Sequence, residues 1–322
     1  MIPYAANLPR RYPGLKPFER AQSAVFYGRR EDAVRLTNLI VQQRLMVLFA
    51  KSGIGKTSIL QAGVAPLLEP QNFAPIFLRL DKTDTPLVDT VREILTNHPL
   101  AGRRVAVGER PGEHETMWEL MKRLEFDLDG LPATPVLVFD QFEEVFTLGH
   151  SDTSRRRFLS ELADLANGAM PESIRASLLQ RFQQGDASLT ADIMQWWERQ
   201  PELRVVISIR SDFLHLLDDI SPLIPGILHN RYQLQPLNRK QAEEAISSPA
   251  TSPGGPYASA PFVFRTDALD QIIDFLAGRD KQTAQQTMED LPLLKKQDEI
   301  ESFNLQILCQ YVEEKIIKEA KP

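Results

Sequence analysis

Short apolar runs recur along the chain at 45–49, 136–139 and 205–209. Runs of this length with few polar positions are typical of strands buried on both faces of a parallel sheet. Two further segments, 74–80 and 231–237, are predicted to be short extended pieces. The pattern therefore predicts a parallel sheet as the centre of the fold.

Between these strands, apolar residues recur at helical spacing. The predicted helices are 31–42, 56–68, 84–97, 114–124, a helical region over 152–200, 239–246, 265–278 and 300–320. Strands that alternate with helices predict an α/β fold. The Pro-rich start, 1–25, is expected to be an extended arm. The stretch 247–261 is rich in Ser, Pro, Gly and Ala, which indicates a linker before C-terminal helices.

The first apolar strand runs directly into Ala50-Lys-Ser-Gly-Ile-Gly-Lys-Thr57. This spacing, between a strand and a helix, is typical of a phosphate-binding loop. Gly53 and Gly55 let the backbone turn tightly and aim its N–H groups at anionic oxygens. Lys56 supplies a mobile charge for the β- and γ-phosphates, and the Thr57 hydroxyl is a ligand for Mg²⁺. The residues expected to hold ATP or ADP are Ser52, Gly53, Ile54, Gly55, Lys56, Thr57 and Ser58.

The loop departs from the usual pattern at its first glycine, which is Ala50. Alanine is the smallest possible replacement, so the loop is still expected to form, with a different shape or affinity. The alternative is a chance Gly-Lys-Thr sequence. The strand before the loop and the helix after it favour the phosphate-binding interpretation.

A carboxylate group stands at the end of the second apolar strand. Asp140 follows 136–139, at the edge where open α/β sheets bind ligands. It is expected to hold Mg²⁺ together with Thr57; the alternative is that it caps a helix. Glu143 and Glu144 follow, and either is a candidate general base that activates water. The sequence leaves the choice between them open.

The third strand ends at Arg210, next to Asp212. An arginine at this edge is expected to sense the γ-phosphate, because its planar fork pairs with phosphate oxygens. The alternative is an ion pair with Asp212 or Asp140. The arginines at 155–157 most resemble a solvated helix face, with an arginine finger as the alternative.

A turn at 26–29, Phe-Tyr-Gly-Arg, precedes the helix 31–42. Gly28 permits close approach of an adenine base, and Arg29 is suited to stack on it or to reach phosphate. Pro236 offers a rigid apolar surface for the same base. The alternative for the turn is an ordinary surface loop.

The composition limits the partners and the location. The chain is 43% hydrophobic and 25% charged, with a formal net charge of −6 and no long basic tract, so nucleic acid is not expected as a constitutive partner. No run of about 18 apolar residues predicts a membrane span. Cys309 is the one cysteine, which excludes a disulfide within the chain, and the start lacks signal-peptide features. These features predict a cytoplasmic protein.

Together these segments resemble the ATPase module of STAND-class NTPases, most closely the bacterial novel STAND group related to NACHT and NB-ARC modules. The resemblance covers about 12–314. It is carried by Pro13-Gly-Leu-Lys-Pro-Phe18, Phe26-Tyr-Gly-Arg29, the phosphate loop, Asp140-Gln-Phe-Glu-Glu144, Ile209-Arg-Ser-Asp-Phe213 and Leu234-Gln-Pro-Leu237. It implies an AAA+-like P-loop core with a C-terminal helical lid and an ATP-driven switch in signalling or anti-phage defence.

The predicted organisation is an arm at 1–25, an ATPase core at 26–246 with a helical insertion around 152–200, and a linker and lid at 247–322. The predicted function is a slow ATPase whose nucleotide state controls homo-oligomerisation. The alternative is a scaffold that binds nucleotide without hydrolysing it. Because family members usually carry effector and sensor domains in a longer chain, this chain is expected to be a fragment or to work with partner chains.

Overall fold

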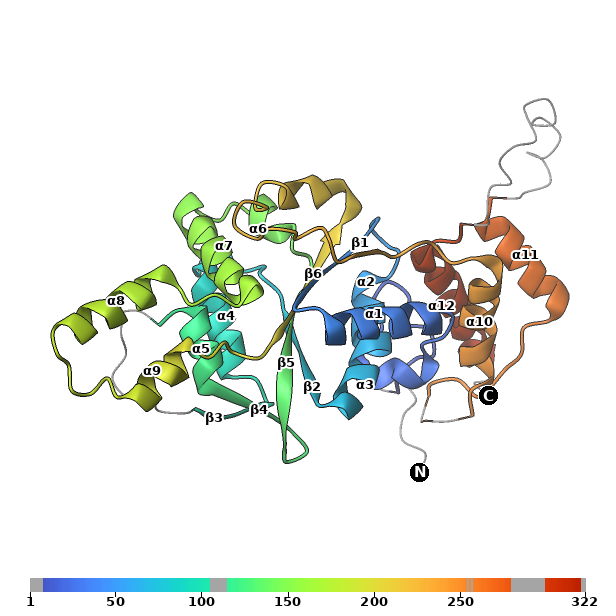
Figure 1. The fold of residues 1–322 in the computed structure, drawn as a ribbon. Coiled ribbons are helices and arrows are strands. Elements are labelled where there is room, and N and C mark those ends of the chain that lie inside the picture. The colour runs from blue at the N-terminus through green and yellow to red at the C-terminus, as the bar shows by residue number, and fades with distance from the viewer. Residues whose placement is uncertain (1–7, 105–114, 254, 256, 279–298, 320–322) are drawn as a thin grey trace. The chain divides into compact units, whose positions relative to one another are not determined.

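The computed structural model describes residues 8–104, 115–253, 255, 257–278 and 299–319 (Figure 1). The described chain forms two compact units. One contains Met1–Arg35, Ala50–Pro66 and Leu234–Pro322, and the other contains Leu36–Phe49 and Leu67–Gln233. We call them the loop unit and the sheet unit, after the phosphate loop and the sheet, and describe each by itself.

The sheet unit is built on a sheet that has seven strands within the described residues. The strands are β1 (Leu45–Ala50), β2 (Phe73–Leu78), β3 (Ala101–Arg104), β4 (Leu124–Leu128), β5 (Leu131–Phe139), β6 (Arg204–Arg210) and β7 (Arg231–Gln233). β5 pairs in parallel with β2 and β6, and β1 pairs in parallel with β7. Since β6 lies between β5 and β1, the parallel strands run in the order β2, β5, β6, β1, β7. The predicted parallel sheet is confirmed.

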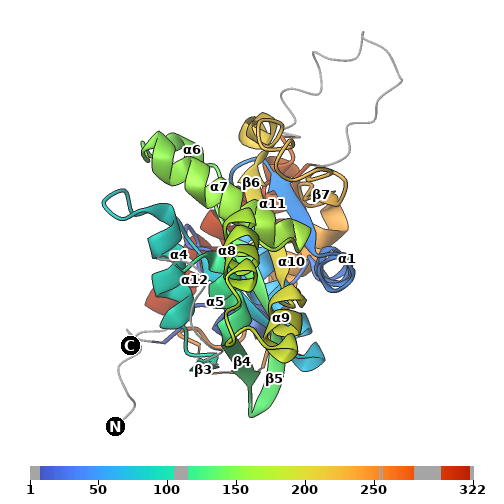
Figure 2. The ribbon, with the colours of Figure 1, turned by 60° about the vertical axis from the view of Figure 1, so that its left-hand side comes forward.

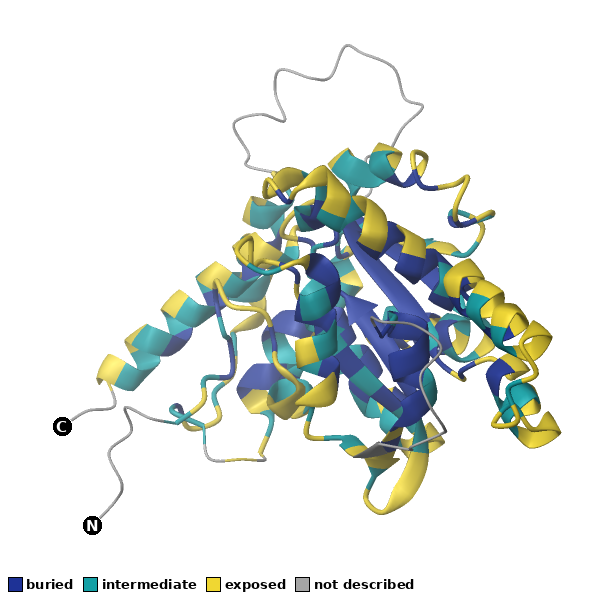
Figure 3. Ribbon diagram, turned by 90° about the vertical axis from the view of Figure 1, so that its left-hand side faces the viewer, coloured by how far each residue is buried: buried dark blue, intermediate teal, exposed yellow. Residues whose placement is uncertain are grey.

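The apolar runs that predicted the strands are buried, as Figure 3 shows by the dark-blue central strands. Every residue of the run 136–139 is buried, and so is every residue of 205–209. Burial on both faces explains why these strands are apolar at successive positions instead of alternating.

An antiparallel hairpin extends this sheet and was not predicted. β4 pairs with β5, which begins at Leu131 instead of at 136. Asp129 and Gly130 join the strands with φ values of 53° and 83°. An Asp-Gly pair with two positive φ angles suits a tight hairpin, so this dipeptide was the available sequence signal. Most of the polar stretch 103–112, and the predicted helix start at 114, lie outside the described residues.

Helices cover the sheet. They are α4 (Leu87–Thr96), α5 (Met117–Arg123), α6 (Glu144–Thr147), α7 (Asp152–Asn167), α8 (Glu172–Gln183) and α9 (Ala191–Glu198). α4, α5 and α7 pack against one another (Figure 2). The predicted helical region 152–200 is therefore confirmed as α7, α8 and α9. Gly168, with φ 66°, ends α7.

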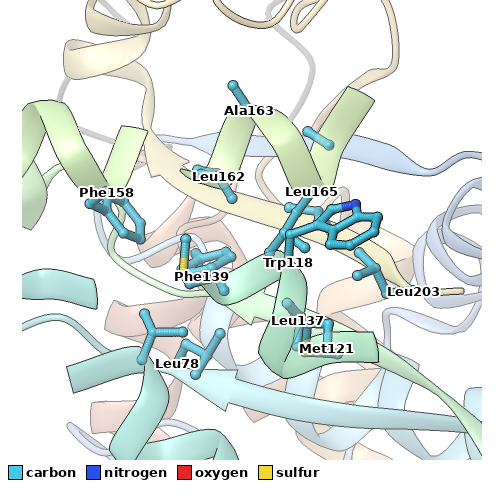
Figure 4. Close-up of a cluster of buried hydrophobic side chains, with 14 of the residues drawn as sticks. Leu78, Trp118, Met121, Leu137, Phe139, Phe158, Leu162, Ala163, Leu165 and Leu203 are labelled. Atoms are coloured by element: carbon cyan, nitrogen blue, oxygen red, sulfur yellow. The ribbon is translucent and has the colours of Figure 1, made fainter. Parts of the chain in front are cut away.

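Aromatic side chains fill the core between these helices and the sheet (Figure 4). Trp118 of α5 stacks on Trp197 of α9, with ring centroids 6.1 Å apart, and both side chains are buried. Lys122 lies over the rings of Trp118 and Trp196 and donates to the carbonyls of Trp196 and Arg199. Burial lowers the pKa of Lys122 to about 8.

The loop unit combines the phosphate loop with helices from both ends of the chain. They include α2 (Lys56–Ser58), a π-helical turn over Ile59–Val64, α10 (Arg239–Thr251), α11 (Thr266–Leu276) and α12 (Ser302–Glu319). α1 (Arg30–Gln42) begins in this unit and ends in the sheet unit. Where helices were predicted at 31–42, 56–68, 265–278 and 300–320, helices are present, although the helix after the loop is partly π-helical.

The described part of the N-terminal segment is not simply an extended arm. Arg20–Val25 forms a 3₁₀ helix, and Tyr12 is fully buried in the core between α10 and α12. Residues 1–7 of the predicted arm lie outside the described part. Since a Tyr ring buries a large apolar surface, this segment contributes to the core of the loop unit.

The predicted linker at 247–261 is wrong for its first residues, because α10 continues through Pro249 to Thr251. Proline removes a backbone donor from a helix. Here side chains from the N-terminal segment bind the carbonyls of this turn. Tyr12 donates its hydroxyl to the Ile246 carbonyl, and Arg11 donates to the Pro249 carbonyl at 2.8 Å.

No helix in the described part of the chain is both long and apolar enough to cross a membrane.

Candidate functional site

The phosphate loop has the backbone expected from its sequence. β1 ends at Ala50 and α2 begins at Lys56, so the predicted strand, loop and helix are confirmed. Gly53 and Gly55 have φ values of 79° and 100°, a region that favours glycine. Ala50, which replaces the usual glycine, is buried at the end of the strand.

The N–H groups of the loop suit an anion. Among the described residues, the N–H groups of Gly53, Ile54 and Gly55 donate to no protein acceptor. Successive N–H groups in a glycine-rich turn at the start of a helix bind phosphate oxygens. The Lys56 ammonium donates to the Ala50 carbonyl at 3.3 Å, so it lies folded over the loop. The loop therefore fits the phosphates of a nucleotide.

The carbonyls of the same loop are bound by the first turn of α12. The Phe303 N–H donates to the Gly53 carbonyl at 3.1 Å. The Ser302 hydroxyl donates to the Ile54 carbonyl at 3.0 Å. A Cβ atom added to Gly53 would lie 3.2 Å from that of Phe303, so the contact is close. The first turn of α12 is thus bound to the backbone of the phosphate loop.

Arg29 strengthens this contact. The side chain is 4% exposed, and its guanidinium donates to Ile54 O and Ser302 Oγ, both at 3.2 Å, and to Gln235 O at 2.8 Å. In this structure Arg29 is directed at protein oxygens, and its contact with a base or phosphate stays a prediction.

Gly28 and Pro236 were predicted to approach adenine. Gly28 has φ 80°, and a Cβ atom there would lie 2.3 Å from the Gln241 carbonyl of α10. The close approach that requires this glycine is therefore to a helix of the protein. Pro236 is half-buried, and its neighbour Leu237 pairs with Ile300 at the start of the lid. Contact of either residue with a base stays a prediction.

A pocket opens beside the phosphate loop and is mostly apolar. Its wall is made by Phe18, Val25, Phe26, Tyr27, Arg29, Ile54, Gly55, Ser58, Leu237, Ala245, Ser302, Leu305 and Gln306. The Ser58 hydroxyl accepts a hydrogen bond from the Phe18 N–H at 3.1 Å, which ties the N-terminal segment to the loop. Sequence reasoning did not assign Phe18, Ser302 or Gln306 to the site. Phe18 ends a motif that was quoted only for the family resemblance, and no motif or spacing connects Ser302 and Gln306 with the loop.

The other predicted residues belong to the sheet unit. Asp140 directly follows β5, and its Oδ1 accepts from the Ser208 hydroxyl of β6 at 2.7 Å. The alternative in which Asp140 caps a helix is wrong, since Glu143 holds the N-cap position of α6. No group of three His, Cys, Asp or Glu suited to a metal occurs among the described residues. Asp140 fits the way Mg²⁺ binds, through one or two carboxylates, waters and substrate phosphates.

Glu143 and Glu144 lie in different surroundings. Glu143 is 7% exposed, and its Oε2 accepts from the Arg210 N–H at the end of β6, at 3.3 Å. Glu144 pairs at 3.2 Å with Arg79, which follows β2. Because β5 lies between β2 and β6, the two carboxylates point along the sheet in opposite directions. Of the two, only Glu143 faces the side of the sheet on which β6 and β1 lie.

Arg210 is the last residue of the buried strand β6, but its side chain is not buried. Its side chain is 39% exposed and pairs with Asp212 at 2.6 Å. It also lies 5.2 Å from the centre of the Phe213 ring. The alternative ion pair with Asp212 is therefore present in this structure.

Comparison with protein families gives one match. A sequence model described as Novel STAND NTPase 1 matches residues 11–297, which is most of the chain. No curated protein matches this chain.

Similar solved structures include ATPases. A Walker-type ATPase of Pyrococcus abyssi is 15% identical over 71% of this chain, with a TM-score of 0.36, and this chain spans 59% of its length. AMPPCP-bound DnaA from Aquifex aeolicus is 13% identical over 86% of this chain and 68% of its own, with a TM-score of 0.40. The ORC2 protein of Aeropyrum pernix is 11% identical over 89% of this chain and 68% of its own, with a TM-score of 0.36. Since these TM-scores are below 0.5, the family assignment rests on the family match.

Proposed function

Because this chain belongs to the Novel STAND NTPase 1 family, we propose that it is an ATP-driven regulatory switch. In this proposal the phosphate loop binds ATP, the protein hydrolyses it slowly, and the bound nucleotide controls how α12 lies on the loop. The proposed core is 26–246 and the proposed lid is 247–322.

One observation supports a switch above all others: the first turn of α12 is bonded to the carbonyls of Gly53 and Ile54. The N–H groups of the same peptide segment are directed at phosphate in the proposal. A nucleotide that adjusts the loop therefore changes the geometry that the lid helix bonds to. A ligand shifts the equilibrium between two positions of α12 only as far as it binds more tightly to the protein in one of them.

We assign roles to four residues at the phosphates. Thr57 and Asp140 hold Mg²⁺, which neutralises charge on the phosphate oxygens when it is bound. Lys56 contacts the β- and γ-phosphates. Glu143 accepts a proton from the attacking water, and the support for choosing it over Glu144 is its direction toward β6. Glu144 then has a structural role as the partner of Arg79.

Arg210 provides a test of how ATP and ADP are distinguished. We expect Arg210→Ala to weaken ATP binding by about tenfold and to leave ADP binding nearly unchanged, because only ATP carries the γ-phosphate. Loss of the ion pair with Asp212 should affect this result little, since an exposed ion pair contributes only about 0–1 kcal/mol. Titration of both nucleotides into parent and variant measures the effect. Equal losses for ATP and ADP would remove Arg210 from the sensor role.

We further propose that the ATP state associates into homo-oligomers, that the protein acts in the cytoplasm, and that it serves signalling or anti-phage defence with effector or sensor parts. The support for these points is the family alone.

The central test is steady-state phosphate release, measured over a range of protein concentrations. For a switch that hydrolyses ATP upon assembly, we expect the rate per molecule to rise with concentration. A rate per molecule that is constant contradicts coupling to assembly. Tight retention of nucleotide with no phosphate release favours the non-hydrolysing scaffold instead.

A further inference from the structure

One buried polar atom belongs to a residue in the wall of the pocket beside the phosphate loop. The side-chain oxygen of Gln306, Oε1, is buried and makes no hydrogen bond with any described residue. A buried acceptor without a donor loses its bonds to water and gains nothing in return, so such atoms are rare in proteins. A hydrogen-bond donor on a ligand bound in this pocket would satisfy it.

The walls of the pocket suit a flat aromatic ring. Phe18 and Phe26 lie edge to face, with centroids 5.3 Å apart, and Leu237 and Leu305 add aliphatic surface. Apolar and aromatic walls with one directed polar group are typical of sites for small planar ligands. Gly55 and Ser58 of the phosphate loop lie in the same wall, so the pocket adjoins the proposed phosphate site.

The position of Gln306 on α12 links the pocket to the lid contact. Ser302, which donates to the phosphate loop, lies four residues before Gln306 in the same helix. Residues at this spacing lie on one face of a helix. One face of α12 therefore contacts both the loop and the pocket.

We infer that Gln306 reads the base of the nucleotide, by accepting a hydrogen bond from the 6-amino group of adenine. This inference rests on the proposed function, because it places the phosphates of the same molecule on the adjoining loop. A purine with an oxygen at position 6 presents an acceptor to the Gln306 oxygen instead of a donor. With the amide oriented as in the structure, Gln306 therefore favours adenine, and it does so from the helix that the nucleotide controls.

The test compares ATP with inosine triphosphate, which has an oxygen in place of the 6-amino group. We expect the parent to bind ATP about tenfold more tightly, since one hydrogen bond and one unsatisfied acceptor separate the two ligands. In Gln306→Leu this preference should disappear, while binding of inosine triphosphate changes little and so reports an intact fold. Gln306→Glu keeps an acceptor and should keep the preference for ATP.

The matched control is Asn304→Leu, which replaces an exposed amide two residues away in the same helix and should leave the preference unchanged. Equal binding of ATP and inosine triphosphate by the parent overturns the inference, and so does a preference for inosine triphosphate. An ATP preference that persists in Gln306→Leu also overturns it. These outcomes leave the proposed function intact. If the parent binds neither nucleotide, the proposed function itself is wrong and the inference falls with it.

Discussion

Glu143→Gln should lower the rate of phosphate release by about 10²–10⁴-fold, the usual loss when a general base is removed, and should retain ATP binding. The amide of glutamine cannot take a proton from water at neutral pH. Its oxygen can still accept from the Arg210 N–H, so the end of β6 keeps its hydrogen bond. Single-turnover phosphate release, together with ATP titration, measures both quantities.

The matched variant is Glu144→Gln, because the two glutamates are neighbours of identical chemistry that face opposite directions along the sheet. We expect it to change the rate little, since Glu144 pairs with Arg79 on the β2 side. If Glu144→Gln were the slow variant and Glu143→Gln the normal one, the assignment would be reversed. If both variants released phosphate at the parent rate, neither carboxylate would be the base.

Lys56→Ala should weaken ATP binding by about a hundredfold, the upper part of the range for a hydrogen bond between charged groups. The expected cause is the loss of the mobile cation that contacts two phosphate groups. The fold should survive, because Lys56 is half-buried and is not a core residue, with its ammonium bonded to Ala50 O at 3.3 Å. Titration of ATP and a thermal unfolding curve measure the two effects separately.

Lys51→Ala is the matched control, since Lys51 is an exposed lysine in the same loop. It removes the same charge from the same segment and should cost little affinity. A similar loss in both variants would mean that only the general positive charge of the loop matters. Unchanged ATP binding in Lys56→Ala would show that the loop does not hold the phosphates in the predicted way.

Much of the site could be predicted because its residues are contiguous. The strand, the glycine turn and the helix start of the phosphate loop lie within 45–58, and the local conformation follows from the residue types alone. The positions of Asp140 and Arg210 could be predicted as well, because Asp140 follows one apolar strand and Arg210 ends another. The hairpin at Asp129 and Gly130 also has a local signal in the sequence, since its turn is an Asp-Gly dipeptide.

Other features could not be predicted because they depend on which strands become neighbours. Glu143 and Glu144 are equivalent in sequence, and only the order β2, β5, β6 gives them different partners. Arg210 is the last residue of a buried strand, and the sequence leaves the partner of its side chain open. Its side chain lies beyond the strand end, where solvent and Asp212 reach it.

The sequence by itself determined the α/β class, the phosphate loop and the membership in a family of NTPases, because local residue pattern fixes local backbone and motif chemistry. The tertiary structure decided the contact between α12 and the phosphate loop. Ser302 and Ile54 are 248 residues apart, and no periodicity or motif connects them. Such contacts arise when the whole chain packs, since the entropy of closing so long a segment is offset only by the core that forms around it.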